Sequence, residues 1–136
     1  MIKSGKSKKE KSYSDTRSEI AESAAKEKGC VVVKPGPRDL FVDIDTEEQL
    51  ENFEKCFEIL TRSVQGIRMV MRPSPSGEKG RFHAYVTMPY DLTSKDRILF
   101  QAILGSDPVR ECLSYVRLVC GDENPTLFFE KSKVMS

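Results

Sequence analysis

Hydrophobic and polar residues alternate along several short segments of this chain, and elsewhere they recur at the spacing of a helix. The most informative segment, residues 39–45, reads Asp-Leu-Phe-Val-Asp-Ile-Asp. Successive side chains of a strand point to opposite faces, so this alternation predicts a strand with one wholly apolar face. The apolar face carries Leu40, Val42 and Ile44, and the other face carries Phe41, Asp43 and Asp45.

The same reasoning predicts the remaining elements. Thr46 and Gln49 form a capping box, in which each side chain accepts a hydrogen bond from the backbone N–H of the other residue. Gly66 ends the helix that follows. Asp107 before Pro108 has the order of a helix cap and a first helical residue. The predicted strands are 30–34, 39–45, 67–72, 81–88 and 126–131, and the predicted helices begin at residues 15, 46, 93 and 108. The last two helices have apolar stripes of Ile98, Leu99, Ala102 and Ile103, and of Val109, Cys112, Leu113 and Val116.

From residue 39 onward the predicted order is strand, helix, strand, strand, helix, strand. This order predicts an α+β fold of the ferredoxin-like or RNA-recognition-motif type, a four-stranded antiparallel sheet with helices on one face. The predicted domain covers residues 39–136, after a helix and a short strand at 15–38. In this plan the last strand flanks the first. The helix side takes Leu40, Val42, Ile44, Phe82, Ala84, Val86, Leu127 and Phe129, and the open side takes Asp43, Asp45, Arg68, Arg72, His83, Tyr85, Phe128 and Glu130.

Charge is concentrated at the N-terminus. The 136-residue chain has a formal net charge of +1, but residues 1–14 are rich in Lys, Ser and Gly and include Lys8 and Lys9. We expect a disordered basic tail, which either keeps the protein soluble or holds nucleic-acid phosphates without sequence preference. The chain has no apolar run of membrane-spanning length and no secretory pattern, so we expect a cytoplasmic protein without membrane contact.

The cysteines and the histidine narrow the possible chemistry. The four cysteines, at positions 30, 56, 112 and 120, lack metal-binding spacing and lie in apolar periodic stretches. We expect them to be reduced core residues, not zinc ligands or a disulfide framework. His83 is the only histidine, which excludes sites and mechanisms that need two.

The predicted open face gathers most of the titratable side chains of the sheet. Asp43 and Asp45 on the first strand, with Glu130 on a neighbouring strand, would bring three carboxylates together. Oxygen ligands of this kind suit Mg²⁺ or Mn²⁺, and a pair of such ions supports in-line displacement at phosphorus. We therefore predict two divalent cations held by these three acids. The alternative is a solvated strand end, where Asp-x-Asp pairs are common.

A loop of turn-forming residues at 73–80 precedes the strand that carries His83. Its backbone amides and nearby cations would approach a nucleoside triphosphate, with His83 in contact with a phosphate. A plain hairpin loop is the alternative. The predicted nucleotide contacts are Ser76, Gly77, Lys79, Arg81 and His83, and the predicted nucleic-acid contacts are Arg68, Arg72, Tyr85, Arg110, Lys8 and Lys9.

Three short motifs resemble those of the archaeo-eukaryotic primase superfamily. The segment 41–45, Phe-Val-Asp-Ile-Asp, resembles its first motif, and the segment 76–83, Ser-Gly-Glu-Lys-Gly-Arg-Phe-His, is similar to its second. The segment 127–130, Leu-Phe-Phe-Glu, is a candidate for its third. The resemblance implies a minimal catalytic core with the RNA-recognition-motif plan, of phage or mobile-element type.

The resemblance also implies residue roles and partners. Asp43, Asp45 and Glu130 would bind two metal ions, and His83 would contact the incoming nucleotide. The implied partners are a nucleoside triphosphate, a single-stranded DNA template or primer, and a helicase or another replication protein.

Three functions stay open at this point. The first is a primase-type nucleotidyltransferase that primes or extends nucleic acid with two divalent metals. The second is a non-catalytic module that stacks bases on Phe41, Tyr85 and Phe128. The third is an assembly subunit that only shares the fold. Carboxylates beside the aromatic rings would repel phosphates unless a metal were bound, which disfavours the second function.

Overall fold

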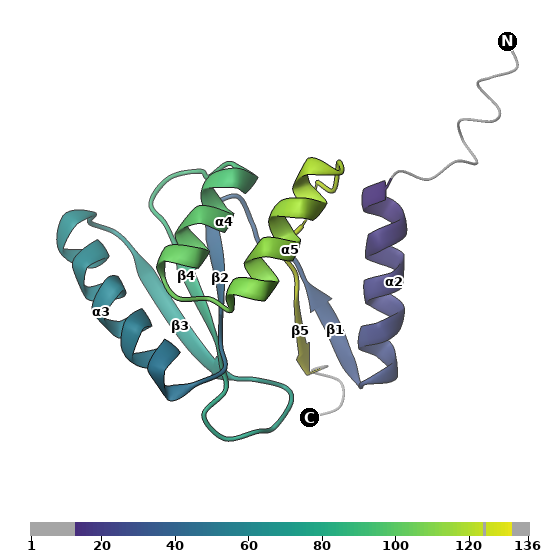
Figure 1. Cartoon of the computed structure of the whole chain (residues 1–136), viewed down its shortest axis with the longest axis horizontal. Coiled ribbons are helices and arrows are strands. Elements are labelled where there is room, and N and C mark those ends of the chain that lie inside the picture. The colour runs from purple at the N-terminus through teal and green to yellow at the C-terminus, as the bar shows by residue number, and fades with distance from the viewer. Residues whose placement is uncertain (1–12, 124, 132–136) are drawn as a thin grey trace, which may run out of the picture.

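The structure is a computed structural model that describes residues 13–123 and 125–131. These residues form an α+β fold with four helices and two small antiparallel sheets (Figure 1). Within the described ranges, no helix is long and apolar enough to cross a lipid bilayer. The helices are α2 (Tyr13–Glu27), α3 (Glu47–Ser63), α4 (Ser94–Ile103) and α5 (Pro108–Val119), and the strands are β1 (Cys30–Val33), β2 (Asp39–Ile44), β3 (Arg68–Pro73), β4 (Phe82–Thr87) and β5 (Phe128–Lys131).

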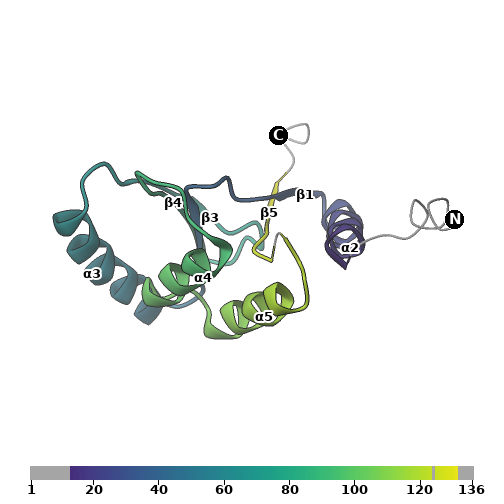
Figure 2. The same ribbon diagram turned by 90° about the horizontal axis from the view of Figure 1, so that it is seen from above.

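The main core lies between the larger sheet and its helices. This sheet has the strand order β2-β4-β3, and Figure 2 shows α3, α4 and α5 on one side of the strands. The predicted apolar face of β2 is confirmed, and each of its aliphatic side chains contributes roughly 1.5–3 kcal/mol on burial. The fully buried core residues are Leu40, Val42, Ile44, Phe53, Ala84, Val86, Met88 and Leu104.

The prediction of a single four-stranded sheet is wrong. The last strand, β5, pairs with β1 in a separate two-stranded sheet, with Val32 opposite Phe129 and Val33 opposite Phe128. Leu127 and Phe129, which were predicted on the helix side, are only partly buried and lie outside the main core. Phe128, by contrast, is buried.

Polar groups close the edge of β2 that β5 was expected to occupy. The Phe41 N–H donates to Gln101 Oε1 at 2.7 Å, and the Phe41 carbonyl accepts from Arg110 Nη1 at 2.9 Å. The Asp39 carbonyl accepts from Arg97 Nε at 2.7 Å. Buried backbone groups need hydrogen-bond partners, and side chains from α4 and α5 supply them here. A further strand would find these groups already occupied.

The turn between α4 and α5 completes this edge. The Asp43 N–H donates to Ser106 Oγ at 3.0 Å, and the Asp43 carbonyl accepts from the Asp107 N–H at 3.1 Å. Gly105 makes the turn possible because its φ of +87° lies in the left-handed region that favours glycine. The position of Asp43 is thus fixed by hydrogen bonds between both of its backbone groups and this turn.

The predicted capping box is confirmed, and it also holds this turn. Thr46 Oγ1 accepts from the Gln49 N–H at 3.1 Å, and Gln49 Oε1 accepts from the Thr46 N–H at 3.1 Å. Gln49 Oε1 also accepts from the Asp45 N–H at 2.8 Å, and Gln49 Nε2 donates to the Gly105 carbonyl at 3.0 Å. One amide therefore links the end of β2, the start of α3 and the α4–α5 turn.

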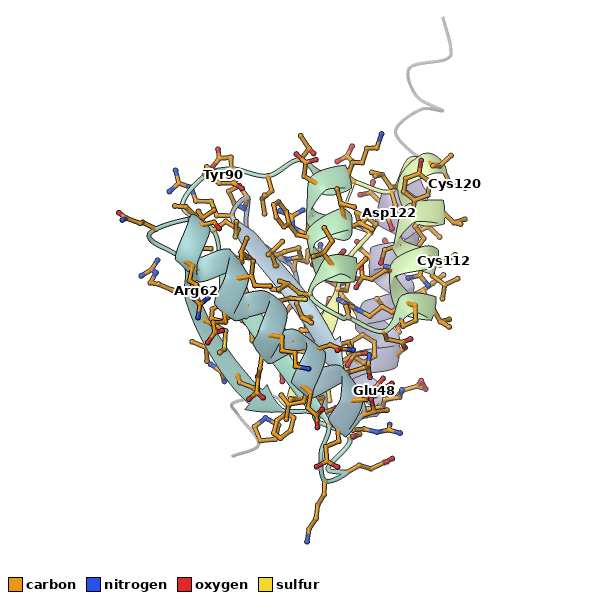
Figure 3. The ribbon with its side chains drawn as sticks, turned by 60° about the vertical axis from the view of Figure 1, so that its left-hand side comes forward. Glu48, Arg62, Tyr90, Cys112, Cys120 and Asp122 are labelled. Atoms are coloured by element: carbon orange, nitrogen blue, oxygen red, sulfur yellow. The ribbon has the colours of Figure 1, made fainter. Side chains whose placement is uncertain are left out.

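Two further expectations need correction. Helix α2 begins at Tyr13, two residues before the predicted start, and the rest of the predicted tail, with Lys8 and Lys9, lies outside the described residues. All four cysteines are free thiols, but Cys112 and Cys120 are exposed and do not belong to a core. Cys112 lies on α5, and Cys120 lies at the C-terminal end of the same helix (Figure 3). The apolar side of α5 faces outward.

We expect Gln101→Leu to lower the free energy of unfolding by about 2–4 kcal/mol, because it leaves the buried Phe41 N–H without its acceptor and Glu111 without its amide donor. The matched control is Gln65→Leu, the same change at an exposed glutamine, where we expect a shift within about 0.5 kcal/mol. Urea denaturation of both variants checks this. Equal losses in the two variants would show that the amide does not hold the edge of β2.

Candidate functional site

Three carboxylates meet where β2 ends and α5 begins. Asp43, Asp45 and Asp107 each offer one carboxylate oxygen, and these oxygens lie within 4.8 Å of one another. Asp43 belongs to β2, and Asp45 follows the strand. Asp107 is the cap of α5, where one carboxylate oxygen accepts from the Val109 N–H at 3.1 Å. All three are partly buried, so their mutual repulsion is poorly screened by water.

The electrostatics of Asp43 indicate that this cluster suits a cation. Burial raises the pKa of Asp43 above its usual range, and the neighbouring Asp45 carboxylate raises it further. Arg110 and His83 act in the opposite direction but do not reverse the rise in that pKa. A divalent cation would stabilise the ionised form of all three acids, and oxygen ligands of this kind fit Mg²⁺ or Mn²⁺.

His83 lies between two carboxylates on the sheet face opposite the helices. It pairs with Asp43 across the β2–β4 ladder, and its Nε2 is 3.8 Å from Asp43 Oδ1. Its Nδ1 is 3.0 Å from Glu130 Oε2, and its buried ring stacks on Phe128 with centroids 3.7 Å apart. Glu130 was predicted as the third carboxylate of the cluster. In the structure it holds His83, and Asp107 takes the third position.

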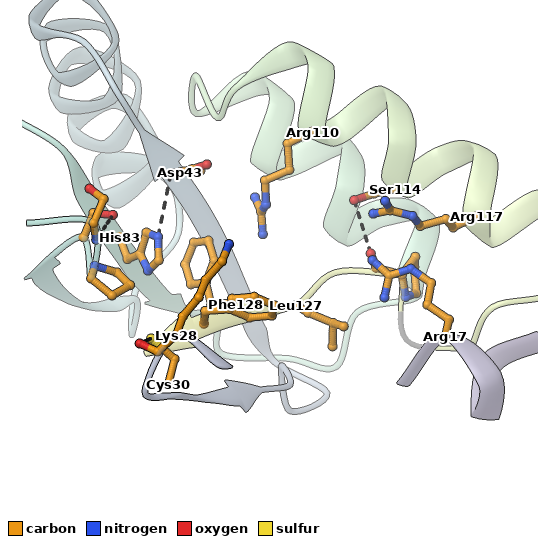
Figure 4. A pocket seen from close by; sticks show the side chains of 15 residues that line it. Arg17, Lys28, Cys30, Asp43, His83, Arg110, Ser114, Arg117, Leu127 and Phe128 are labelled. Carbon is orange, nitrogen blue, oxygen red and sulfur yellow. Dashed lines mark hydrogen bonds and ion pairs between the residues drawn. The ribbon is translucent and has the colours of Figure 1, made fainter. Parts of the chain in front are cut away.

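A cavity of about 410 Å³ adjoins the acidic cluster and shares Asp43 with it. His83 forms part of the same wall. The remaining lining is partly basic and partly apolar, the apolar part coming mainly from the segment 127–129. Figure 4 shows Lys28 and Arg110 directed into the cavity, with Arg17 and Arg117 towards its other end. Hydroxyl groups of Ser74, Ser76 and Ser114 also line the cavity. The chemistry of this lining matches a phosphorylated ligand.

Arg110 is the most constrained cation of the cavity. Its Nη1 donates to the Phe41 carbonyl, to Ser106 Oγ at 3.0 Å and to Glu111 Oε2 at 2.6 Å. Its guanidinium lies 4.5 Å from the centroid of the Phe128 ring. Its buried Nη2 has no hydrogen-bond partner among the described residues. Burial lowers the pKa of Arg110, but guanidinium stays charged in proteins, so Nη2 is a donor available to an anion.

The structure separates the predicted nucleotide contacts into two groups. Ser76 and His83 line the cavity. Gly77 and Lys79 are exposed on the loop and are not among its lining residues, and Arg81 pairs with Glu78 at 3.3 Å. The loop segment 74–76 therefore lines the cavity, whereas Lys79 and Arg81, which were predicted to contact the nucleotide, do not.

The predicted nucleic-acid contacts are also divided. Arg68 and Arg72 are exposed on β3, where the Arg72 guanidinium lies 5.9 Å from the Tyr85 ring centroid. Arg110 belongs to the cavity. Phe41 and Phe128 are buried against each other, with stacked rings 4.9 Å apart, so in this structure they offer no surface to a base.

The sequence reasoning missed Asp107 and three of the basic side chains of the cavity. Asp107 was interpreted only as a helix cap, although Asp107-Pro108 fixes where α5 begins. Arg17 lies on α2, Lys28 follows the end of α2, and Arg117 lies on α5. These segments come together only because β1 pairs with β5. No local pattern signals that pairing.

Comparisons with known proteins assign no family to this chain. No protein-family model, no curated protein and no solved structure matches it. What the site can do chemically is therefore judged from its own residues.

We expect Asp43→Asn to raise the free energy of unfolding at pH 7 in metal-free buffer, because asparagine carries no charge to bury. Because the pKa of Asp43 is raised in the folded state, the stability linked to its protonation is present at low pH and is lost as pH rises through that pKa. The variant should lack this loss. Denaturation across the acid range checks it, with Asp91→Asn, an exposed partner of Arg38, as the control that should not gain stability. A destabilised Asp43→Asn would contradict the assignment.

Proposed function

We propose that this protein is a nucleotidyltransferase of the primase type, which transfers a nucleotide from a nucleoside triphosphate to a nucleic-acid end. One observation carries the proposal: Asp43 belongs both to the carboxylate cluster and to the wall of the basic cavity. A cation held by the cluster would thus lie at the edge of a space suited to phosphates. The likeness of residues 41–45 and 76–83 to primase motifs supports the same reaction.

Asp43, Asp45 and Asp107 would hold the metal, Mg²⁺ or Mn²⁺. Such a cation would supply positive charge beside the substrate phosphates, where it would stabilise the charge that develops during displacement. The predicted number of two ions stays a prediction. The protein's own contribution is to hold the three acids in place, through the closed edge of β2 and the start of α5.

The basic cavity would receive the phosphates of the nucleotide. Its volume of about 410 Å³ falls within the range of about 300–1,000 Å³ typical of small-ligand sites. Arg110 Nη2, Lys28 and Arg117 would donate to phosphate oxygens, and charge-assisted contacts of this kind are about twice as strong as neutral ones. Glu130 would act as a positioning residue, because its bond to Nδ1 fixes the ring of His83 with Nε2 towards Asp43.

The alternative, a metal-free nucleic-acid-binding module on the same surface, has less support. Base stacking requires accessible aromatic rings, and Phe41 and Phe128 are covered. The template, the primer and a helicase or other replication partner follow from the resemblance to primases and are proposed on that basis.

We expect this chain to incorporate radiolabelled nucleotide into a primed template with Mn²⁺, and Asp43→Asn with Asp45→Asn to abolish incorporation. Asp107→Asn should lower it by at least about 100-fold, because it removes a metal ligand, whereas asparagine still caps α5. Glu130→Gln should retain more activity than Asp107→Asn. Unchanged incorporation in the double variant would refute the site.

A stability readout separates metal binding from activity. We expect saturating Mn²⁺ to stabilise the wild type, by about 2.7 kcal/mol at 100 times the dissociation constant, and to leave Asp107→Asn unchanged. Stabilisation of Glu130→Gln should match the wild type. If Mn²⁺ stabilised Asp107→Asn but not Glu130→Gln, Glu130 would be the third metal ligand instead of Asp107.

We expect Lys28→Gln and Arg117→Gln each to weaken nucleoside triphosphate binding about tenfold, since each removes one charge-assisted contact at the cavity. Lys79→Gln is the matched control, because this lysine is exposed on the loop and away from the cavity lining. Calorimetric titration with a non-hydrolysable triphosphate and Mg²⁺ measures the three affinities. Loss at Lys79 alone would place the phosphates on the loop.

A further inference from the structure

Helix α5 has its polar side turned towards the protein and its apolar side turned towards solvent. Glu111 is only 4% exposed and Ser114 is buried as well. By contrast, Val109 is 65% exposed and Val119 is 69% exposed. A surface helix normally has the reverse arrangement, because burial of apolar side chains is what holds it in place.

Helix α4, which packs beside α5, has the same inversion. Arg97 and Gln101 are buried, whereas Leu99 and Ile103 are exposed. The predicted apolar stripes of both helices are therefore largely on the outside, with Ile98 as the buried exception among the large residues.

The inner side of each helix is polar because it has specific partners. Gln101 and Arg110 bond the edge of β2, and Ser114 and Arg117 line the basic cavity. These contacts fix the rotation of the helices, so the apolar side faces out. The result is an outward apolar surface on two helices that pack side by side, which we call the α4–α5 face: Leu99, Ala102, Ile103, Val109, Cys112, Leu113, Tyr115, Val116, Val119 and Cys120.

We propose that the α4–α5 face binds the same face of a second copy of this chain. The exposed area of its large apolar residues, taken as whole residues, is on the order of 700 Å², close to the roughly 800 Å² that each partner contributes to a standard stable interface. Monomeric proteins seldom expose patches larger than about 300–600 Å².

Charge favours a second copy over a partner of different chemistry. The charged residues of α5 are Arg110, Glu111 and Arg117, and all three are turned inward or line the cavity. Lys95 and Asp96 lie at the start of α4, away from the centre of the face. A neutral face does not repel its own copy, and it offers no charge for selecting an acidic or a basic partner.

The spacing along α5 suits a two-fold helix pair. From one turn of α5 to the next, its exposed apolar positions lie three or four residues apart, which is the spacing of a helix–helix seam. These positions are 109, 112, 113, 116, 119 and 120. In a two-fold interface the same residues meet from both copies. Leu113 and Val116, near the middle of α5, would lie close to the axis, with Cys112 beside them.

We expect analytical ultracentrifugation of the full chain at tens of micromolar to give a dimer, within the micromolar-or-tighter range of such interfaces. Val116→Glu should weaken the dimer by at least about 100-fold, because two buried carboxylates would meet across the axis. Ile59→Glu is the matched control and should stay dimeric: Ile59 is 63% exposed, like Val116 at 52%, but lies on α3.

A second measurement does not use Val116→Glu. In a Cys120→Ser background, a short bismaleimide should cross-link the chains through Cys112, and adding Cys112→Ser should abolish the covalent dimer. A wild type that stays monomeric at several hundred micromolar, or a dimer unaffected by Val116→Glu, would overturn the proposal.

Discussion

The outer edge of β2 is the constraint on which the rest of this structure depends. A strand edge presents unpaired amides and carbonyls, and most sheets satisfy them with another strand or leave them to water. Here side chains and one backbone amide from α4, α5 and their turn satisfy them at 2.7–3.1 Å. Asp43 is consequently held from both sides, by β4 along one edge and by the α4–α5 turn along the other.

Closing the edge of β2 in this way requires charged side chains to be buried, which costs free energy. Burial lowers the pKa values of Arg97 and Arg110 and raises that of Glu111, the direction expected when charged groups leave water. Hydrogen bonds to backbone and side chains offset much of that cost. Of this polar layer Arg110 also lines the basic cavity, so one guanidinium both holds the sheet edge and contributes positive charge where a phosphate would bind.

Local patterns predicted the elements well and their assembly less well. The alternation at 39–45, the capping box at 46–49 and the cap at Asp107 all follow from contacts within a few residues, and the structure has them as expected. The pairing of β5 with β1 does not follow from such contacts. It depends on Gln101, Ser106 and Arg110 reaching a strand some 60 residues away in sequence.

The candidate site shows the same division. Asp43 and Asp45 could be identified because they share one strand face, and His83 because its strand pairs with theirs. Asp107 joins them only through the folding of the α4–α5 turn. Periodicity identified the apolar stripes of α4 and α5 but could not give the direction in which they point, because a stripe marks one side of a helix without saying what lies against it.

Gln49 shows how such a fold limits substitution. Glutamate and glutamine serve equally as the third residue of a capping box, since only the carbonyl or carboxylate oxygen is needed. In this protein the amide nitrogen is needed as well, because it donates to the Gly105 carbonyl. Glutamate would keep the start of α3 but set a negative oxygen against that carbonyl, so a replacement that is conservative for the helix is not conservative for the turn.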